Sequence, residues 1–535
     1  SYCSSTFCNL ATFARSGSGS KKVTRLVANP SCNVKRSTRA HSTRSFFSVA
    51  LSLTNIFYCF LGAFLGTLVG VIPGLGVLAA ISMLFPLTFH LEPTTALIML
   101  AGIWYGTTYG GSTASILLNL PGTPANAVTC LDGYPMARQG RGGVALFMTT
   151  VASFFGASFG IVLLTLFTPV IADYALRFGS AEYFALMLMG LVAASTIGSR
   201  RPAKALAMVV LGLILGSVGT DVNSGVQRLT FGQTQMMDGI NLVALAMGLF
   251  GVAEIIGNIR NAEREGSPPH VSLRQLLPTR DDLRRMPGAV ARGSALGSFF
   301  GALPGTGSTI SSFLSYALER RIARRPERFG QGAIEGVAGP EAANNSAAIS
   351  AFVPTLTLGI PGDPIMALML GALVIHGVQP GPLMLEARPD MFWGLVVSFG
   401  IGNLILLVLN LPLIGIWVSM LRIPFRWLYP AIVVFVCLGV YSVRGSSFDI
   451  AAVAVIGAIG YLLAMARFNP ALLLLGFVLG PLIETNLRRA MLIGRGDPMV
   501  FLQRPISAVF VVATVALIAA SLWGAWRRFR SRTAA

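Results

Sequence analysis

Glycine recurs at every fourth position in Gly62-Ala-Phe-Leu-Gly66-Thr-Leu-Val-Gly70-Val-Ile-Pro73-Gly74-Leu-Gly76. This spacing leaves one face of a helix almost bare, so that a neighbouring helix can approach its backbone closely. Pro73-Gly74 then ends the helix, because proline lacks a backbone N–H group and glycine adopts conformations that other residues avoid. The stretch therefore predicts a closely packed helix that is broken at its end.

The same pattern returns 231 positions later in an otherwise different apolar segment. Its members are Gly293, Gly297, Gly301, Pro304, Gly305 and Gly307. A second pair of motifs follows, Pro121-Gly122-Thr123-Pro124 and Pro361-Gly362-Asp363-Pro364, 240 positions apart. The two halves thus carry the same motifs in the same order, which indicates an internal duplication. We expect an inverted repeat, because that is a common transporter arrangement and broken helices in both halves mark the binding site. The alternative is that both glycine series serve helix packing alone.

Composition places the chain among membrane proteins. Hydrophobic residues make up 54% of the chain and charged residues only 11%. Many apolar runs are long enough for a bilayer core of about 30 Å, and they lack the alternation of barrel strands. We expect an all-α polytopic membrane protein with about 10–12 transmembrane helices, plus broken or re-entrant helical hairpins. Residues 1–50 contribute +8 of the net charge of +19, the other basic residues cluster between apolar segments as orientation signals do, and no nucleic-acid motif accompanies them.

The chain divides into five predicted regions. Residues 1–50 are basic, Ser-rich and free of acidic residues, and we expect them to be disordered. They resemble either an organelle transit peptide or sequence upstream of the native start. The other regions are a first transmembrane half at 51–257, a cytoplasmic loop at 258–291, a second transmembrane half at 292–500, and a C-terminal transmembrane helix with a basic tail at 501–535.

Arginine clusters on both sides of the second glycine series predict a re-entrant hairpin. If both clusters are cytoplasmic under the positive-inside rule, the chain between them enters and leaves the membrane on one side. Two full crossings need about 40 residues, which is more than residues 293–319 supply. The tip would be Pro304-Gly305-Thr306-Gly307. The alternative is a pair of tilted, partly buried helices.

Helix breaks within a membrane must face protein or a wet cavity, because their freed N–H and C=O groups cannot face hydrocarbon. The N-terminal end of a half-helix carries partial positive charge and suits a carboxylate, whereas backbone carbonyls with Asn, Ser or Thr oxygens suit sodium. The candidate substrate-binding residues are Gly74, Gly76, Ser112, Asn119, Gly122, Thr123, Gly305, Thr306, Gly307, Ser308, Asn344, Asn345 and Gly362. The candidate coupling-ion residues are Asn119, Asn345, Asp363 and Glu341. Asp363 is alternatively a helix cap, and Glu341 an interfacial residue at a helix start.

Three groups of motifs resemble one known family. They are Gly66 to Gly76, Tyr109-Gly-Gly-Ser-Thr113 with Asn119 to Pro124, and Gly339 to Asn345 with Gly359 to Gly362. Together they resemble the large membrane subunit of the tripartite tricarboxylate transporter family, over roughly residues 55–500. The resemblance implies a small membrane subunit and a periplasmic solute-binding protein as partners. It also implies uptake of carboxylates such as citrate across a bacterial inner membrane, coupled to Na⁺ or H⁺.

We therefore expect a multi-pass permease that works by alternating access in the lipid bilayer. A stand-alone anion channel or carrier without partner subunits is the alternative, because it could use the same half-helix ends. An enzyme is not expected, since the four histidines are scattered and form no nucleophile–base pair or metal cluster. A cofactor is not expected either, and the chain has no phosphate-binding Gly-x4-Gly-Lys-Ser/Thr loop.

Overall fold

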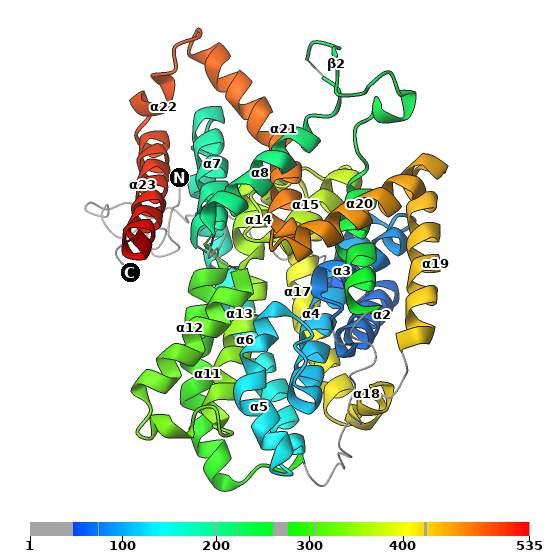
Figure 1. Ribbon diagram of the computed structural model, residues 1–535, viewed down its shortest axis with the longest axis vertical. Helices are drawn as coiled ribbons and strands as arrows, with labels where there is room; N and C mark the ends of the chain where they lie inside the picture. Colours follow the sequence, from blue (N-terminus) through cyan, green and yellow to red (C-terminus); the bar gives the residue numbers. More distant parts are fainter. Residues whose placement is uncertain are drawn as a thin grey trace, which may run out of the picture. The chain divides into compact units, whose positions relative to one another are not determined.

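The computed structural model describes residues 47–72, 74–197, 201–221, 223–259, 276–303, 307–421 and 425–533. Residues 47–50 form a helical turn. The expected disorder of residues 1–50 thus concerns a segment that lies almost wholly outside the described residues. Within the described ranges the chain is overwhelmingly helical, and its strands form one short antiparallel hairpin (Figure 1).

The helices of the first half precede and follow this hairpin. They are α2 (Leu53–Val71), α3 (Val77–Leu84), η1 (Phe85–Thr88), α4 (Pro93–Leu118), η2 (Pro124–Ala127), α5 (Thr129–Arg138), α6 (Gly142–Ala175), α7 (Ser180–Ile197), α8 (Pro202–Gly216), η3 (Thr234–Met236), α9 (Leu242–Ala246), η4 (Met247–Val252) and α10 (Ala253–Ile259). The hairpin strands are β1 (Gly219–Thr220) and β2 (Gln227–Arg228). Gly219 pairs with Arg228, and Thr220 pairs with Gln227.

The second half contains helices throughout its described part. They are α11 (Arg280–Gly301), α12 (Gly307–Ile322), η6 (Pro326–Arg328), α13 (Ile334–Ser350), α14 (Phe352–Leu358), α15 (Pro364–Ile375), α16 (Met384–Ala387), α17 (Pro389–Asn410), α18 (Ile414–Met420), α19 (Phe425–Arg444), α20 (Ser447–Met465), α21 (Pro470–Ile493), α22 (Val500–Gln503) and α23 (Pro505–Thr533).

Five helices are long and apolar enough to cross a membrane: α2, α6, α17, α20 and α21. Shorter apolar helices, including α7, α8 and α15, accompany them. Much of the apolar surface of these helices faces outward; in α6, for example, only 28% of the most apolar window is buried within the protein. Apolar side chains that face outward over this length are stable in hydrocarbon and not in water. The predicted all-α polytopic membrane fold is confirmed.

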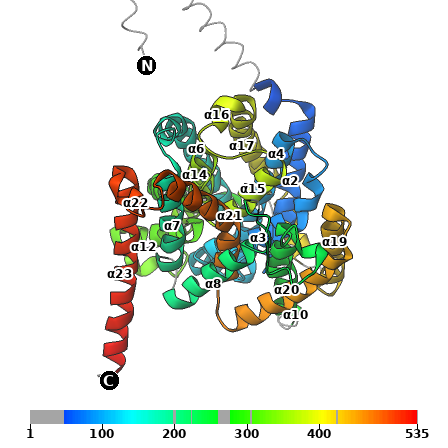
Figure 2. The ribbon, with the colours of Figure 1, turned by 90° about the horizontal axis from the view of Figure 1, so that it is seen from above.

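The glycine series pack in the same register in both halves. A β-carbon on Gly62, Gly66 or Gly70 of α2 would overlap the carbonyl oxygens of Met99, Ile103 and Thr107 on α4. A β-carbon on Gly293, Gly297 or Gly301 of α11 would overlap those of Gly339, Ala343 and Ala347 on α13. Position numbers rise together on both helices of each pair, so each pair runs parallel. The views of Figures 1 and 2 both show α2 beside α4, with α17 next to them.

Helices break at the Pro-Gly motifs. Helix α2 ends before Pro73-Gly74, and α11 ends before the second such motif, of which Pro304, Gly305 and Thr306 lie outside the described residues. Helices α4 and α14 both end at a left-handed residue, Asn119 with φ 58° and Gly359 with φ 67°. The matching of these two ends shows that the local backbone, as well as the sequence motif, is alike in both halves.

Helix α11 begins at Arg280, inside the stretch that the sequence suggested as a loop. Thr279 and Asp282 explain this start, because each side chain accepts a hydrogen bond from the other residue's backbone N–H, which forms a capping box. Asp282 also binds Arg141 at the start of α6, with a nitrogen–oxygen distance of 2.7 Å. The end of α11 that carries Asp282 therefore lies beside the α5–α6 connection.

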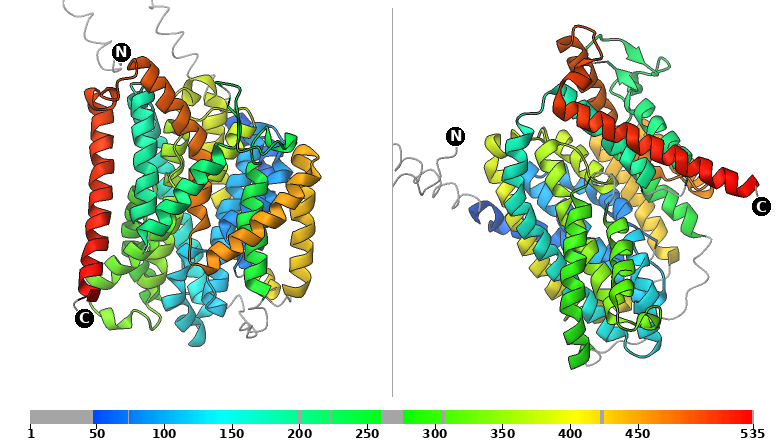
Figure 3. Two further views of the ribbon diagram at one scale, coloured as in Figure 1. Left: turned by 45° about the horizontal axis from the view of Figure 1, so that its top comes forward. Right: turned by 90° about the vertical axis from the view of Figure 1, so that its left-hand side faces the viewer.

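The β-hairpin lies at the other end of the helices, near the end of α21 (Figure 1). Asp221 beside β1 accepts hydrogen bonds from Arg228 of β2 and Arg488 of α21. Arg504 at the start of α23 binds Glu182 at the start of α7 at 2.8 Å. Helices α7 and α23 consequently run side by side from this end, as Figure 3 shows.

Candidate functional site

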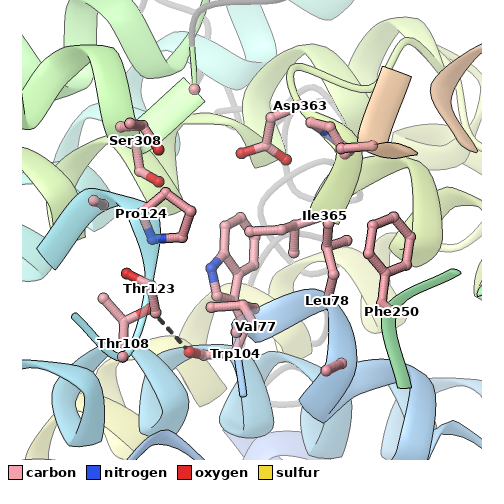
Figure 4. A pocket seen from close by; sticks show the side chains of 18 of the residues that line it. Val77, Leu78, Trp104, Thr108, Thr123, Pro124, Phe250, Ser308, Asp363 and Ile365 are labelled. Atoms are coloured by element: carbon pink, nitrogen blue, oxygen red, sulfur yellow. Dashed lines mark hydrogen bonds between the residues drawn. The ribbon is translucent and has the colours of Figure 1, made fainter. Parts of the chain in front are cut away.

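A cavity of about 680 Å³ lies where the broken helices of the two halves meet (Figure 4). Helix α3 begins at it, and so do α12 and α15. Its lining residues are Gly74, Gly76, Val77, Leu78, Ala79, Trp104, Thr108, Pro121, Gly122, Thr123, Pro124, Ala125, Ala194, Phe250, Glu254, Gly307, Ser308, Thr309, Ile310, Asn344, Asp363, Pro364, Ile365, Asn469, Ala471 and Leu472. The volume suits a small organic molecule.

The two halves line this cavity at matching positions. Residues 76–79 at the start of α3 correspond, 231 positions on, to residues 307–310 at the start of α12. Trp104 on α4 corresponds, 240 positions on, to Asn344 on α13, and residues 123–125 correspond to 363–365. Each offset equals that of the sequence motif to which the residues belong. The repeated motifs thus converge on one site.

The matching positions differ in polarity. The first half contributes the apolar side chains of Val77, Leu78 and Trp104, whereas the second half places Ser308, Thr309 and Asn344 at the same positions. Figure 4 shows Ser308 and Asp363 on one side of the cavity, opposite Val77 and Trp104. At these three positions a ligand in the cavity therefore meets hydrogen-bonding side chains from the second half alone, while Thr108 and Thr123 add hydroxyl groups from the first half.

Helix starts give the cavity backbone N–H groups. Gly76 is the residue before α3, and no side chain caps this helix. The first turn of α12, from Gly307 onward, also lines the cavity. Unpaired N–H groups and partial positive charge at such ends favour an anion.

The side-chain amide of Asn344 independently indicates that the cavity binds a hydrogen-bond acceptor. Its side chain is 2% exposed, and its Nδ2 atom has no hydrogen-bond partner among the described residues. A buried donor without a partner costs about 1–3 kcal/mol, and such groups are rare in native proteins. An acceptor in the cavity, such as a carboxylate oxygen, would supply the missing partner.

Thr123 and Asp363 occupy the same place in the two halves and make the same local contact. Thr123 Oγ1 accepts a hydrogen bond from the N–H of Asn126 at 3.3 Å, and Asp363 Oδ1 accepts one from the N–H of Met366 at 2.8 Å. Each therefore caps the helical segment that follows it. Both residues are 5% exposed and both line the cavity.

The structure brings eight of the predicted site residues together in this cavity. They are Gly74, Gly76, Gly122, Thr123, Gly307, Ser308, Asn344 and Asp363. Gly305 and Thr306 lie outside the described residues. Ser112, Asn119, Glu341, Asn345 and Gly362 are not among the residues that line the cavity.

Glu341 and Asn345 belong to a buried network beside the cavity. Glu341 Oε1 accepts hydrogen bonds from Asn126 Nδ2 at 3.0 Å and from the hydroxyl of Thr129. Asn345 Nδ2 donates to Ser153 Oγ on α6 at 2.7 Å. Helix α13 of the second half is thus hydrogen-bonded to η2, α5 and α6 of the first half.

The three remaining predicted residues, Ser112, Asn119 and Gly362, do not line the cavity, and their contacts are with other parts of the chain. Ser112 accepts a hydrogen bond from Asn126 Nδ2 at 3.0 Å, inside the same network. Asn119 is an exposed residue that ends α4 in the left-handed conformation. Gly362 faces Gly301, since a β-carbon on it would lie 3.3 Å from that carbonyl oxygen. These positions shape the helix breaks around the cavity.

Sequence reasoning missed several lining residues. Trp104 could have been found, because the 240-position offset that relates the Pro-Gly motifs also maps it onto Asn344. Phe250, Glu254 and Asn469 come from η4, α10 and the start of α21, where the sequence shows no repeated motif. They reach the cavity only through tertiary packing.

The charged side chains that line the described part of the cavity are all acidic. Among the described residues that line it, Asp363 and Glu254 are acidic and none is Arg, Lys or His. The described part of the chain also contains no group of three or more His, Cys, Asp or Glu side chains that could hold a metal ion. An anion in this cavity would therefore be bound by N–H, hydroxyl and amide groups rather than by cationic side chains.

Comparisons with known proteins match the chain to one transporter family. Residues 56–475 match the family described as the tripartite tricarboxylate transporter TctA family. A protein of Agrobacterium vitis, described as an uncharacterized 52.8 kDa protein in the TAR-I ttuC' 3' region, is 50% identical over 487 residues, which are 91% of this chain and 97% of that protein. A second, described as an uncharacterized protein in the TAR-II ttuC' 3' region of the same organism, is 55% identical over 212 residues, 40% of this chain and 88% of that protein. No solved structure matches.

The family match covers most of the chain and includes the helix breaks that form the cavity. TctA proteins form a transporter family rather than an enzyme family. A tripartite transporter of this type combines a large membrane subunit with a small membrane subunit and a periplasmic binding protein. This chain belongs to the tripartite tricarboxylate transporter TctA family, whose members are the large membrane subunits.

Proposed function

We propose that this chain is the permease subunit of a binding-protein-dependent secondary transporter that takes up a small carboxylate. The observation that carries the proposal is the cavity lined at matching positions by the broken helices of both halves. Transporter substrate sites are commonly built from discontinuous helices at the interface of two repeats. The family supports the transport of a carboxylate, and the substrate is citrate or a related di- or monocarboxylate.

The carboxylate binds near the starts of α3 and α12, which line the cavity, and the N–H groups at the start of α3 have no side-chain cap. Asn344 Nδ2 donates a hydrogen bond to one of its oxygens and thereby acquires a partner. Ser308 and Thr309 supply further hydroxyl donors on the same side. Because no described lining residue is cationic, the binding of an anion together with Na⁺ or H⁺ lowers the electrostatic cost.

The two halves form an inverted repeat. The parallel pairs α2–α4 and α11–α13 share one contact register. Helix α13 begins next to α5, since Asp132 of α5 accepts hydrogen bonds of 2.8 Å from the N–H groups of Gly330, Gly332 and Ala333. Helix α4 instead ends towards α5, because only η2 separates the two. The equivalent helices therefore run in opposite directions, which suits alternating access around a central site.

The permease lies in the bacterial inner membrane with its α5–α6 connection in the cytoplasm. Basic residues gather at this end, including Arg138 and Arg141 near the connection and Arg320 and Arg321 at the end of α12. Helices α11 and α12 form a hairpin that enters and leaves at this end, with a bidentate ion pair between Arg292 and Glu319. The β-hairpin end faces the periplasm, where the binding protein delivers its ligand.

Copurification and uptake test the proposal together. The tagged chain, isolated gently from its native membrane after cross-linking, is expected to bring a small membrane subunit and a periplasmic binding protein with it. Proteoliposomes of this complex are expected to accumulate a carboxylate only when an ion gradient is present. Recovery of the chain alone, with carboxylate flux that merely follows the carboxylate gradient, would instead support a stand-alone channel.

A further inference from the structure

Asp363 has an ionisable carboxyl group, whereas its structural role as a cap requires only a hydrogen-bond acceptor. The residue at the matching position of the first half is Thr123, which caps its helical segment through a neutral hydroxyl. Asp363 caps α15 through Oδ1, which accepts a hydrogen bond from the N–H of Met366. The described residues form no ion pair with Asp363, although its side chain is 5% exposed. Capping therefore explains one carboxyl oxygen and leaves the second oxygen, and the need for an ionisable group, unexplained.

The second oxygen of Asp363 points into the region where an anion would bind. A β-carbon on Gly307 would lie 3.7 Å from Asp363 Oδ2, so this oxygen is next to the first residue of α12. Asn344, with its unpartnered Nδ2, lines the same cavity. An ionised Asp363 and an anionic substrate would repel each other at such short range in a poorly solvated site, whereas a neutral carboxyl group would not.

We propose that Asp363 binds the proton that is transported together with the carboxylate. This inference rests on the proposed function and specifies its coupling ion. The carboxylate of Asp363 takes up one proton from the periplasmic side, which removes its charge and allows the anionic substrate to bind. After the cavity opens to the cytoplasm, the substrate leaves and Asp363 releases the proton. No covalent bond to the substrate forms or breaks in this cycle.

Few other titratable side chains of the described residues lie near Asp363, so few could take up the proton in its place. Helix α12 begins next to Asp363 and has its titratable residues, Tyr316, Glu319, Arg320 and Arg321, in its second half. The helices with the most contacts to α15 are α3, α4, α14 and α21. Helices α3 and α14 have no titratable side chains, α4 has Tyr105 and Tyr109, and α21 carries its charges, Glu484, Arg488 and Arg489, in its last turns. His376 stands at the far end of α15.

Glu254 is the other acidic residue that lines the cavity, and it is exposed. It comes from α10 and has an interaction of its own. Asp363 differs from it in being buried next to the start of α12. A site for sodium would require several oxygen ligands around the carboxylate. Among the described residues, the printed hydrogen bond of Asp363 is with the N–H of Met366, and this difference favours a proton.

The test uses proteoliposomes that contain the complete complex, with a pH-sensitive dye inside. Uptake of radiolabelled citrate, succinate, lactate and benzoate is measured in sodium-free buffer, with and without an imposed pH gradient. For the wild type we expect at least one of these carboxylates to enter about tenfold faster with the pH gradient than without it. We expect the lumen to become more acidic during this uptake.

Asp363→Thr is the decisive variant, because threonine is the native cap at the matching position and carries no titratable proton. We expect this variant to exchange external for internal carboxylate but to lose both the stimulation by the pH gradient and the acidification. Asp363→Glu should restore both, which shows that the loss is not a folding defect. Asp173→Thr, at an exposed position of α6, should behave as the wild type.

The outcomes separate this inference from the proposed function. Unchanged proton uptake in Asp363→Thr, or wild-type uptake that follows a sodium gradient and ignores a pH gradient, would overturn the role of Asp363 alone. Failure of the wild-type complex to transport any of the four carboxylates would overturn the proposed function and this inference with it. Loss of carboxylate exchange in both Asp363→Thr and Asp363→Glu would identify Asp363 as a purely structural cap.

Discussion

Gly297 on α11 lies so close to Ala343 on α13 that a β-carbon on the glycine would overlap the alanine's carbonyl oxygen. The β-carbon is fixed to the backbone of α11 and the atom that it would meet is a backbone carbonyl of α13, so no side-chain rotation can relieve the overlap. Glycine at this position therefore sets the distance between two helices, one of which carries Asn344 into the cavity. The contact connects the glycine spacing in the sequence with the geometry of the site.

We predict that Gly297→Ala destabilises the protein and reduces carboxylate uptake. Helices α11 and α13 must separate to admit the methyl group, and overpacking of this kind costs about 1–3 kcal/mol. The midpoint of thermal unfolding in detergent should fall, and uptake should fall with it. Gly400→Ala is the matched control, because Gly400 lies in a helix and a β-carbon on it would contact nothing within 4 Å. Equal effects of both substitutions would contradict the prediction.

We predict that Asn344→Leu weakens carboxylate binding without unfolding the protein. Leucine cannot donate a hydrogen bond, so the ligand loses about 1–3 kcal/mol of interaction, or about fivefold to 150-fold in affinity. Stability should hold or rise, because the substitution removes a buried donor that has no partner. Isothermal titration and thermal unfolding measure the two effects separately.

Asn486→Leu provides the control for Asn344→Leu. Asn486 lies on α21 and donates to the carbonyl of Leu482 one turn earlier, away from the cavity. We expect its replacement to leave carboxylate affinity unchanged. An Asn344→Leu variant that bound the carboxylate as tightly as the wild type would remove Asn344 from the site.

The helix breaks could be predicted from the sequence because their causes are local. Proline prevents a backbone hydrogen bond wherever it occurs in a helix, and glycine permits a left-handed residue. The four breaks after α2, α4, α11 and α14 follow from such motifs. The all-α membrane fold could be predicted for a similar reason, since the length and composition of the apolar runs determine it.

The lining of the cavity could be predicted only in part, because helix rotation depends on packing. Asn344 and Asn345 are neighbours in the chain, and consecutive residues point about 100° apart around a helix. Asn344 lines the cavity, whereas Asn345 donates to Ser153 on α6. The sequence alone gives both the same chemistry. Only the contacts of α13 with α6 and α11 decide which one faces the cavity.

We predict that Glu341→Ala destabilises the protein more than a substitution at an exposed acidic residue. The change leaves the donors of Asn126 and Thr129 without their buried acceptor, at a cost on the order of 3 kcal/mol. The thermal unfolding midpoint in detergent measures the loss. Glu92→Ala is the control, because Glu92 is exposed and its side chain caps nothing, so a change within about 0.5 kcal/mol is expected. Equal stability of both variants would show that the network contributes little.

We predict that Asp221→Asn loosens the β-hairpin at neutral pH. A hydrogen bond of 2.6 Å from Ser224 Oγ and an N–H from Asn223, assisted by Arg488 and Arg228, hold the pKa of Asp221 below its usual range. Because the folded-state pKa is lowered, this stabilisation is fully present above the ordinary aspartate pKa of about 4. It is lost as the pH falls below that value towards the folded-state pKa.

Limited proteolysis of residues 217–241 between pH 7 and pH 3 measures this dependence. The wild-type hairpin should resist cleavage at pH 7 and become more susceptible below about pH 4, whereas Asp221→Asn should be cleaved faster at pH 7 and change less with acid. An acid-active protease such as pepsin is needed at the lower end of the range. Asp238→Asn, on the same loop and exposed, should match the wild type. Equal cleavage of all three proteins at pH 7 would show that the ion pairs of Asp221 with Arg228 and Arg488 do not stabilise the hairpin.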